Sequence, residues 1–316
     1  MTRDLQIVFM GTPEFAVSTL DIMLTNEFNV VGVITAPDKP AGRGRKLNES
    51  AVKTYALSKG LTVLQPTNLK NENFIAQLKA LKANLQVVVA FRMLPKVVWQ
   101  MPEFGTFNLH ASLLPNYRGA APINWAIING EQKTGVSTFF IDEKIDTGEM
   151  ILQKEVEISK TETAGELHDK IMEVGSHLVI DTLKLIEKGN ATTTPQIETE
   201  NIKTAYKLNK ENCFINWNNP IEKIYNQVRG LNPYPAAWCL LQNGNEELNV
   251  KIYEVKPIEN SHNFEIGTLL IDKDKIEIAA KNGLIKLLEI KLPGKRKMEV
   301  KSLLNGFKFE DNTKML

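Results

Sequence analysis

The chain has 316 residues, of which 43% are hydrophobic and 24% are charged. These values are typical of a folded globular protein, and the length favours about two domains. The formal net charge is only +1, which excludes a strong electrostatic field around the protein as a whole. A nucleic acid or a membrane surface would therefore have to be recognised through a local basic patch.

The cysteine content and the N-terminus indicate the compartment. Cys213 and Cys239 are the only cysteines, and no close Cys/His spacing surrounds them. This excludes a disulfide framework and argues against a bound metal. The N-terminal apolar run is too short for a signal peptide, and no stretch is long enough for a membrane span. We expect a cytoplasmic protein with no metal and no membrane partner.

The first half of the chain alternates short apolar strands with helical patterns, which is typical of a parallel sheet covered by helices on both faces. The expected strands span residues 5–10, 29–35, 85–90, 106–111, 134–141 and 150–158. The expected helices span residues 13–25, 48–59, 72–82, 95–101, 122–129 and 163–188.

The pattern changes after Gly189. Residues 190–207 are polar and threonine-rich, without periodicity, and this is typical of a linker. A helix is expected at 220–229, followed by short strands at 248–255, 267–271, 275–280 and 283–290. Their spacing of roughly ten residues favours a small β-barrel, of the OB type among other candidates. We therefore expect a first domain at 1–189, a linker at 190–207 and a second domain at 208–316.

The stretch "NLHASLLP" contains the first candidate site residues. Asn108 and His110 are two positions apart on an expected strand, so both side chains project from the same face. The strand then runs into a loop, which places them at its carboxyl end, where open α/β sheets bind ligands. A carboxamide can donate to an oxyanion, and an imidazole can transfer a proton. A buried, structurally satisfied polar pair is the alternative.

A carboxylate follows a neighbouring strand in "FFIDEKIDTGEM". Asp146 stands in an Asp-Thr-Gly triplet, and its carboxylate could orient the imidazolium of His110. The alternative is a turn or cap aspartate, which is common before glycine. Asp142 is interpreted as structural.

The segment from "NLHASLLPNYRGAAP" to "IDTGEM" closely resembles the methionyl-tRNA formyltransferase family. The resemblance extends to "VFMGTPEFA", "APDKPAGRGRKL" and "RGLNPYPAAW", and so covers essentially the whole chain. It implies a Rossmann-like, mostly parallel sheet of the formyltransferase type with a smaller C-terminal OB-like β-barrel that binds tRNA. It also implies transfer of a formyl group from 10-formyltetrahydrofolate to the α-amino group of methionyl initiator tRNA, by a monomer in the cytoplasm.

The resemblance assigns roles to residues of this chain. Asn108, His110 and Asp146 fall on the three catalytic positions. The folate segment comprises Ser112, Leu113, Leu114 and Pro115. In "VVVAFRMLP" many family members carry a glycine and an additional residue, whereas this chain has Phe91 and Arg92, so the wall of the folate pocket is expected to differ. Arg92 either approaches the folate carboxylates or extends into solvent, and we favour solvent.

Two basic segments are candidates for tRNA contacts. In "PDKPAGRGRKL" the prolines and glycines exclude a helix or a central strand and favour a loop beside the site. The resemblance implies that this loop, with Lys39, Arg43, Arg45 and Lys46, engages the acceptor stem, chiefly through Arg43. Residues 281–301 contain seven basic and two acidic residues. They include Lys295, Arg296 and Lys297, which we expect to contact phosphates unless they form a merely solvated face.

Rival functions fit less well. A nicotinamide-dependent oxidoreductase would explain a Rossmann-like first domain. However, the first strand is followed by "GTPEF", which has one glycine where the dinucleotide fingerprint needs three. One Asp-Thr-Gly triplet does not supply the paired carboxylates of an aspartic protease, although a homodimer could. Ser112 lacks the nucleophile elbow of a serine hydrolase. A non-catalytic tRNA-binding protein has no need of the Asn, His and Asp set. Sugar-nucleotide N-formyltransferases can share the Asn-x-His core and a second domain, but they resemble this chain less in "PDKPAGRGRKL" and "DTGEM".

Overall fold

The computed structural model describes residues 2–41, 46–198 and 200–316, and its internal contacts divide the chain into two compact units. The first unit contains the residues up to Gly119 together with Thr134–Val156 and Asp169–Thr204. The second unit contains Ala120–Lys133, Glu157–His168 and Ala205–Leu316.

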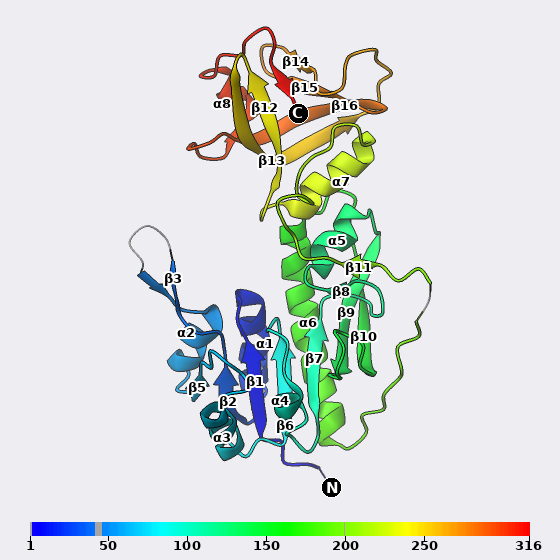
Figure 1. The fold of residues 1–316 in the computed structure, drawn as a ribbon. Helices are drawn as coiled ribbons and strands as arrows, with labels where there is room; N and C mark the ends of the chain where they lie inside the picture. Colours follow the sequence, from blue (N-terminus) through cyan, green and yellow to red (C-terminus); the bar gives the residue numbers. More distant parts are fainter. Residues whose placement is uncertain (1, 42–45, 199) are drawn as a thin grey trace. The chain divides into compact units, whose positions relative to one another are not determined.

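A seven-stranded sheet in the order β10-β9-β7-β6-β1-β2-β5 forms the centre of the first unit (Figure 1). Its strands are β1 (Ile7–Gly11), β2 (Val30–Ile34), β5 (Val63–Leu64), β6 (Leu85–Val89), β7 (Thr106–His110), β9 (Lys133–Phe140) and β10 (Met150–Glu157). Neighbouring strands from β5 to β7 are parallel, whereas β9 runs antiparallel to β7. The prediction of a mostly parallel sheet is confirmed.

Helices cover both faces of this sheet, which explains why β1 and β6 are buried along their whole length. The helices are α1 (Glu14–Thr25), α2 (Ala51–Ser58), α3 (Glu72–Ala80), α4 (Lys96–Trp99) and α6 (Ala164–Glu187). Phe74 and Leu78 of α3 and Val98 of α4 share a core with Val88 of β6. On the opposite face, Gly175 of α6 lies against Leu109 of β7, and a Cβ there would be 3.0 Å from the leucine side chain.

Local sequence signals fix where several helices begin. Ser50 caps α2 by accepting from the backbone N–H of Lys53. The start of α6 is a capping box, because Thr163 N donates to Glu166 Oε2 at 2.8 Å while Glu166 N donates to Thr163 Oγ1 at 3.3 Å. This reciprocal pair accounts for the observed start close to the predicted one.

Two short ladders lie outside the main sheet. Strands β3 (Lys39–Ala41) and β4 (Lys46–Asn48) form an antiparallel pair that flanks residues 42–45, and β8 (Arg118–Gly119) pairs with β11 (Thr204–Ala205). The described parts of the basic segment, residues 37–41 and 46–47, are therefore neither helix nor a strand of the central sheet, in agreement with the prediction from its prolines and glycines. Within the described residues, no helix is long and apolar enough to cross a membrane.

The second unit is built around an antiparallel sheet in the order β14-β15-β16-β13-β12-β18, with β17 also paired to β16. Its elements are α5 (Pro122–Ile128), α7 (Ile221–Leu231), β12 (Ala237–Asn243), β13 (Glu246–Ile258), β14 (Leu269–Ile271), β15 (Ile276–Ala280), β16 (Gly283–Lys291), β17 (Met298–Glu299), α8 (Val300–Leu304) and β18 (Lys314–Met315). A bridge between Thr268 and Lys314 joins the two ends of the sheet. The predicted small barrel is confirmed.

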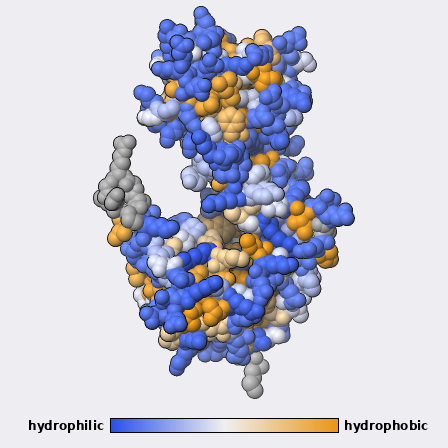
Figure 2. Space-filling model, in the orientation of Figure 1, coloured by the Kyte–Doolittle hydropathy of each residue, from blue (hydrophilic) through white to orange (hydrophobic). Residues whose placement is uncertain are grey.

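Alternate side chains of these strands fill the barrel. On β12, Ala237, Cys239 and Leu241 are fully buried, with less buried residues between them. Both cysteines lie in this core as free thiols. The face of this unit seen in Figure 2 is mostly hydrophilic.

Candidate active site

Asn108 and His110 lie on one face of β7, at its carboxyl end. Leu109, between them, faces α6, so the asparagine and the histidine project from the opposite face of the sheet. In register, Asn108 pairs with Val88 of β6 and His110 pairs with Ser137 of β9. A strand flanked on both sides holds these two side chains in fixed positions, and the predicted shared face is observed.

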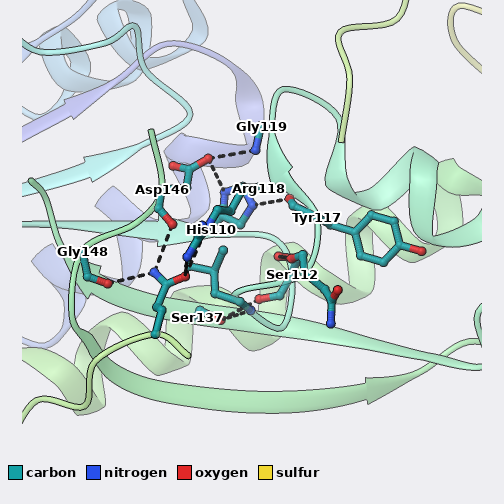
Figure 3. Close-up of polar contacts among 11 residues, drawn as sticks. His110, Ser112, Tyr117, Arg118, Gly119, Ser137, Asp146 and Gly148 are labelled. Atoms are coloured by element: carbon teal, nitrogen blue, oxygen red, sulfur yellow. Dashed lines mark hydrogen bonds and ion pairs between the residues drawn. The ribbon is translucent and has the colours of Figure 1, made fainter. Parts of the chain in front are cut away.

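Both ring nitrogens of His110 face protein oxygen atoms (Figure 3). Nε2 is 2.8 Å from the carbonyl oxygen of Tyr117. Because a carbonyl only accepts, Nε2 carries a proton and donates it there. Nδ1 is 3.7 Å from Asp146 Oδ2, and the two side chains are only 7% and 16% exposed. Nδ1, next to the carboxylate, is therefore the ring nitrogen that is not occupied by the carbonyl of Tyr117.

The loop that carries Asp146 is fixed by its backbone. Asp146 adopts a left-handed conformation with φ of 55°, and its Oδ2 accepts from the N–H of Gly119 at 2.9 Å. Two residues later, a Cβ on Gly148 would lie 1.7 Å from the carbonyl oxygen of Phe140. The glycine of Asp-Thr-Gly thus allows the loop to pass close to β9. Asp142 accepts from Lys144 and Thr147 within the same loop, which agrees with its structural interpretation.

The carboxamide of Asn108 is partly buried, and within the described residues no hydrogen bond to it is found. A half-buried amide without a protein partner is unusual, because buried polar groups are normally satisfied. Its N–H groups are therefore available to a ligand.

The segment from Ser112 to Pro115 follows directly. Ser112 is buried and its hydroxyl donates to the carbonyl of Asn116 at 2.6 Å, so the side chain serves the turn itself. Ser137 anchors the segment by donating to the carbonyl of Ser112 at 2.6 Å and accepting from the N–H of Leu114 at 3.2 Å. Leu114 is buried, whereas Leu113 and Pro115 are partly exposed and can contact a ligand.

Phe91 and Arg92 follow β6. Phe91 packs on the core formed with α3 and α4. Arg92 is exposed, and its guanidinium donates to the carbonyls of Pro66 and Thr67. Partial desolvation of the guanidinium lowers its pKa below the usual value of arginine. The Arg92 side chain is thus exposed to solvent, as we favoured, and these two backbone carbonyls hold its guanidinium at the protein surface.

The predicted tRNA-binding residues fall into two separate groups. Lys39 is exposed on β3 and Lys46 begins β4, whereas Arg43 and Arg45 lie outside the described residues. Lys295, Arg296 and Lys297 are exposed in the turn between β16 and β17. Lys297 Nζ is 2.6 Å from Glu289 Oε2 and lies over the ring of Tyr253. The pairing with Glu289 raises the pKa of Lys297.

Three further residues contribute to the site and were not predicted from the sequence: Tyr117, Arg118 and Gln196. The backbone carbonyl of Tyr117 holds His110, and no sequence signal identifies a backbone partner. Gln196 Nε2 donates to the carbonyls of Asp146 at 3.0 Å and Gly148 at 2.8 Å. Its Oε1 accepts from Arg118. The surrounding threonine-rich segment suggests only a linker.

Comparison with known proteins agrees with this architecture. A family model described as "Formyl transferase" matches residues 5–183, and one described as "Formyl transferase, C-terminal domain" matches residues 207–308. The methionyl-tRNA formyltransferase of Flavobacterium johnsoniae is 65% identical, over 98% of this chain and 99% of the relative. That of Parabacteroides distasonis is 51% identical, over 97% of each.

Solved structures share the fold at lower identity. WlaRD, a sugar 3N-formyltransferase, aligns with a TM-score of 0.65 and 20% identity, covering 93% of this chain and all of its own. HypX from Aquifex aeolicus in complex with tetrahydrofolic acid aligns with a TM-score of 0.64 and 17% identity, covering 96% of this chain and 47% of its own. These two similarities concern the fold alone. The full-length matches at 65% and 51% identity show that the chain belongs to the methionyl-tRNA formyltransferase family.

Proposed function

We propose that Asn108, His110 and Asp146 catalyse the reaction of this family, formyl transfer from 10-formyltetrahydrofolate to the α-amino group of methionyl initiator tRNA. The observation that carries the proposal is their geometry. Asn108 and His110 lie at the carboxyl end of β7, the Asn108 carboxamide has no hydrogen-bond partner among the described residues, and Asp146 of the β9–β10 loop places Oδ2 3.7 Å from His110 Nδ1.

The chemistry needs one oxyanion donor and one proton carrier. The amine nitrogen attacks the formyl carbon, a C–N bond forms, and the carbonyl oxygen becomes an oxyanion. Asn108 donates to this oxygen without bringing a charge of its own. The attacking nitrogen then loses a proton, the bond from carbon to N10 of the folate breaks, and N10 gains a proton.

His110 and Asp146 manage the proton. Nε2 is committed to the Tyr117 carbonyl, so Nδ1 takes the proton released by the amine. The adjacent carboxylate stabilises the resulting imidazolium, whose positive charge also favours the oxyanion. The separation of 3.7 Å exceeds a direct hydrogen bond, and such contacts often tighten when substrate binds.

The substrates meet the protein on surfaces of different character. Leu113, Leu114 and Pro115, with the backbone of Ser112, form the proposed folate segment, and Phe91 and Arg92 form its neighbouring wall. Exposed apolar side chains in adjacent loops, such as Met93 at 66% and Ile145 at 60%, offer faces to a flat pterin ring. Figure 2 shows apolar side chains exposed among hydrophilic ones on this unit.

We further propose the tRNA contacts, the domain boundaries, the oligomeric state and the cellular compartment of the enzyme. Lys39, Arg43, Arg45 and Lys46 contact the acceptor end, and Lys295, Arg296 and Lys297 contact phosphates. The catalytic domain spans 1–189, the linker 190–207 and the tRNA-binding domain 208–316. The enzyme acts as a monomer in the cytoplasm.

The test is single-turnover formyl transfer to methionyl initiator tRNA by Asn108→Ala, His110→Ala and Asp146→Ala. Each variant should lose about a hundred- to a thousandfold in rate, as expected for removal of a single transition-state contact. Circular dichroism and thermal unfolding establish that each variant is folded. A loss below tenfold in a folded variant returns that residue to a structural role.

A further inference from the structure

Gln196 is turned inward on a segment whose neighbours are exposed. Thr194, Pro195 and Glu198 are exposed, and Ile197 is 75% exposed, whereas Gln196 is half-buried. Ordinary polarity would place the isoleucine inside and the glutamine outside. A polar side chain that occupies the inner position in place of an available apolar one points to a specific task.

The amide of Gln196 has all four of its hydrogen-bonding positions filled. Oε1 accepts from Arg118 Nε at 3.1 Å and from its terminal nitrogen at 2.8 Å. Nε2 donates to the carbonyls of Asp146 at 3.0 Å and Gly148 at 2.8 Å. Rotating the amide by half a turn would set donors against donors and oxygen against oxygen, so only one orientation fits. The guanidinium charge strengthens the network.

This network acts on the backbone that aims the Asp146 carboxylate. Asp146 has a left-handed conformation, which a non-glycine residue keeps only when its surroundings enforce it. Gln196 donates to the carbonyls of Asp146 and Gly148. The N–H of Gly119 donates to Asp146 Oδ2 (Figure 3). Arg118, which is adjacent to Gly119, donates to Gln196 and so links the two sets of hydrogen bonds.

The same segment also supports the partner of His110. Tyr117, whose carbonyl accepts from His110, donates its own N–H to the carbonyl of Lys203 at 2.6 Å. Thr194 exchanges two backbone hydrogen bonds of 2.9 Å with Met150. Residues expected to form a linker are therefore attached to both loops that define the His110–Asp146 pair.

We propose that Gln196 is a positioning residue for the formyl-transfer reaction, which holds Asp146 Oδ2 opposite His110 Nδ1 by donating to the backbone of the Asp146 loop. The inference rests on the proposed catalytic role of Asp146. It requires that loss of the two N–H donors harms catalysis even when the attachment to Arg118 survives.

Gln196→Glu separates these two functions. The carboxylate keeps the shape of the side chain and pairs with Arg118, but it presents oxygen to the two carbonyls and cannot donate when ionised. We expect kcat to fall about ten- to a hundredfold, since a misplacement near 1 Å has an effect of this size. The KM values for tRNA and folate should change less than threefold, which is a much smaller effect than the expected fall in kcat. Gln196→Met, which removes donors and acceptor together, should lose at least as much.

Glu198→Gln is the matched control. Glu198 lies on the same segment, is 73% exposed and pairs with the same Arg118 at 3.4 Å, so this variant should retain the wild-type kcat. A double-mutant cycle gives a second readout. In an Asp146→Ala background, Gln196→Glu should cause little further loss, because it acts only through the missing carboxylate.

The results distinguish a positioning role of Gln196 from the catalytic role of Asp146, on which it depends. If Asp146→Ala is impaired but Gln196→Glu keeps the wild-type kcat, or if the two losses multiply independently, Gln196 only tethers its segment and the inference is overturned. If Asp146→Ala itself transfers formyl at the wild-type rate, the catalytic role of Asp146 fails, and the positioning inference fails with it.

Discussion

Gly148 shows at the residue scale how closely the Asp146 loop approaches the sheet. A Cβ at this position would stand 1.7 Å from the Phe140 carbonyl oxygen, a distance that requires the backbone to move. Gly148→Ala should lower the free energy of unfolding by about 3 kcal/mol, because forced overpacking usually costs 1–3 kcal/mol and backbone cannot yield as a side chain does. Chemical denaturation measures this change.

Gly306→Ala is the control for that variant. A Cβ at Gly306 meets nothing within 4 Å, so this substitution should leave stability unchanged or slightly raised. Gly148→Ala should also lose formyl transfer beyond its loss of stability, since the displaced loop carries Asp146. Equal stability of the two variants would mean that the loop adapts freely and does not fix the carboxylate.

The residues around the site differ in how far the sequence predicts them. The shared face of Asn108 and His110 follows from strand alternation and needs no tertiary information. The approach of Asp146 to His110 depends on how two loops pack, which no local pattern determines. Gln196 was not predicted, because its inward orientation arises from Arg118 and two backbone carbonyls far away in the chain.

At the scale of elements, the turn between β16 and β17 tests the phosphate contacts. Lys297 is paired with Glu289 at 2.6 Å, whereas within the described residues Lys295 and Arg296 have no carboxylate partner. Neutralising Lys295 and Arg296 together should flatten the plot of log binding constant against log salt by about 0.9 per lost phosphate contact. Lys297→Ala should change the slope less. Filter binding of methionyl-tRNA to the full chain at several salt concentrations provides the measurement, and an unchanged slope in the double variant would exclude this turn from the interface.

The ladder of β3 and β4 supports a second test of tRNA recognition. It flanks the segment with Arg43 and Arg45, whose guanidinium groups can pair bidentately with phosphate or stack on a base. Initiator tRNA should protect the Arg43 and Arg45 sites from trypsin, and folate alone should not. Arg43→Ala and Arg43→Lys should both lower kcat/KM for methionyl-tRNA. Full efficiency in Arg43→Ala together with no protection would remove this segment from the acceptor site.

The sequence predicts some of the helices and strands and not others. The apolar runs identified β1, β2, β6, β7, β9 and β10, and the helical periodicity predicted α6 from residue 163, close to its observed start at Ala164. The antiparallel direction of β9 was not predictable, because a single strand carries no mark of its neighbour's direction. Strand β12 was not predicted. The two-residue strands β17 and β18 were not predicted either, because such short strands are defined by their pairing partners and not by periodicity.

At the scale of the whole molecule, the two thiols report on the integrity of the barrel. Burial raises the pKa of both Cys213 and Cys239, which lowers the fraction of reactive thiolate at pH 8. Neither thiol should react with Ellman's reagent in the native protein, and both should react once guanidinium unfolds the chain. Cys213→Ser and Cys239→Ser assign the two signals. Rapid reaction of either thiol under native conditions would show that the barrel opens on that timescale.

The choice of acceptor tests whether this site serves methionyl initiator tRNA. The full chain is incubated with 10-formyltetrahydrofolate and, in parallel, with methionyl initiator tRNA or an amino sugar nucleotide, and the initial rate of formyl transfer is measured. We expect rapid N-formylation of methionyl-tRNA that is abolished by His110→Ala, and no comparable transfer to the amino sugar nucleotide. Faster transfer to the sugar amine, or transfer to methionyl-tRNA that survives His110→Ala at the wild-type rate, would contradict this expectation.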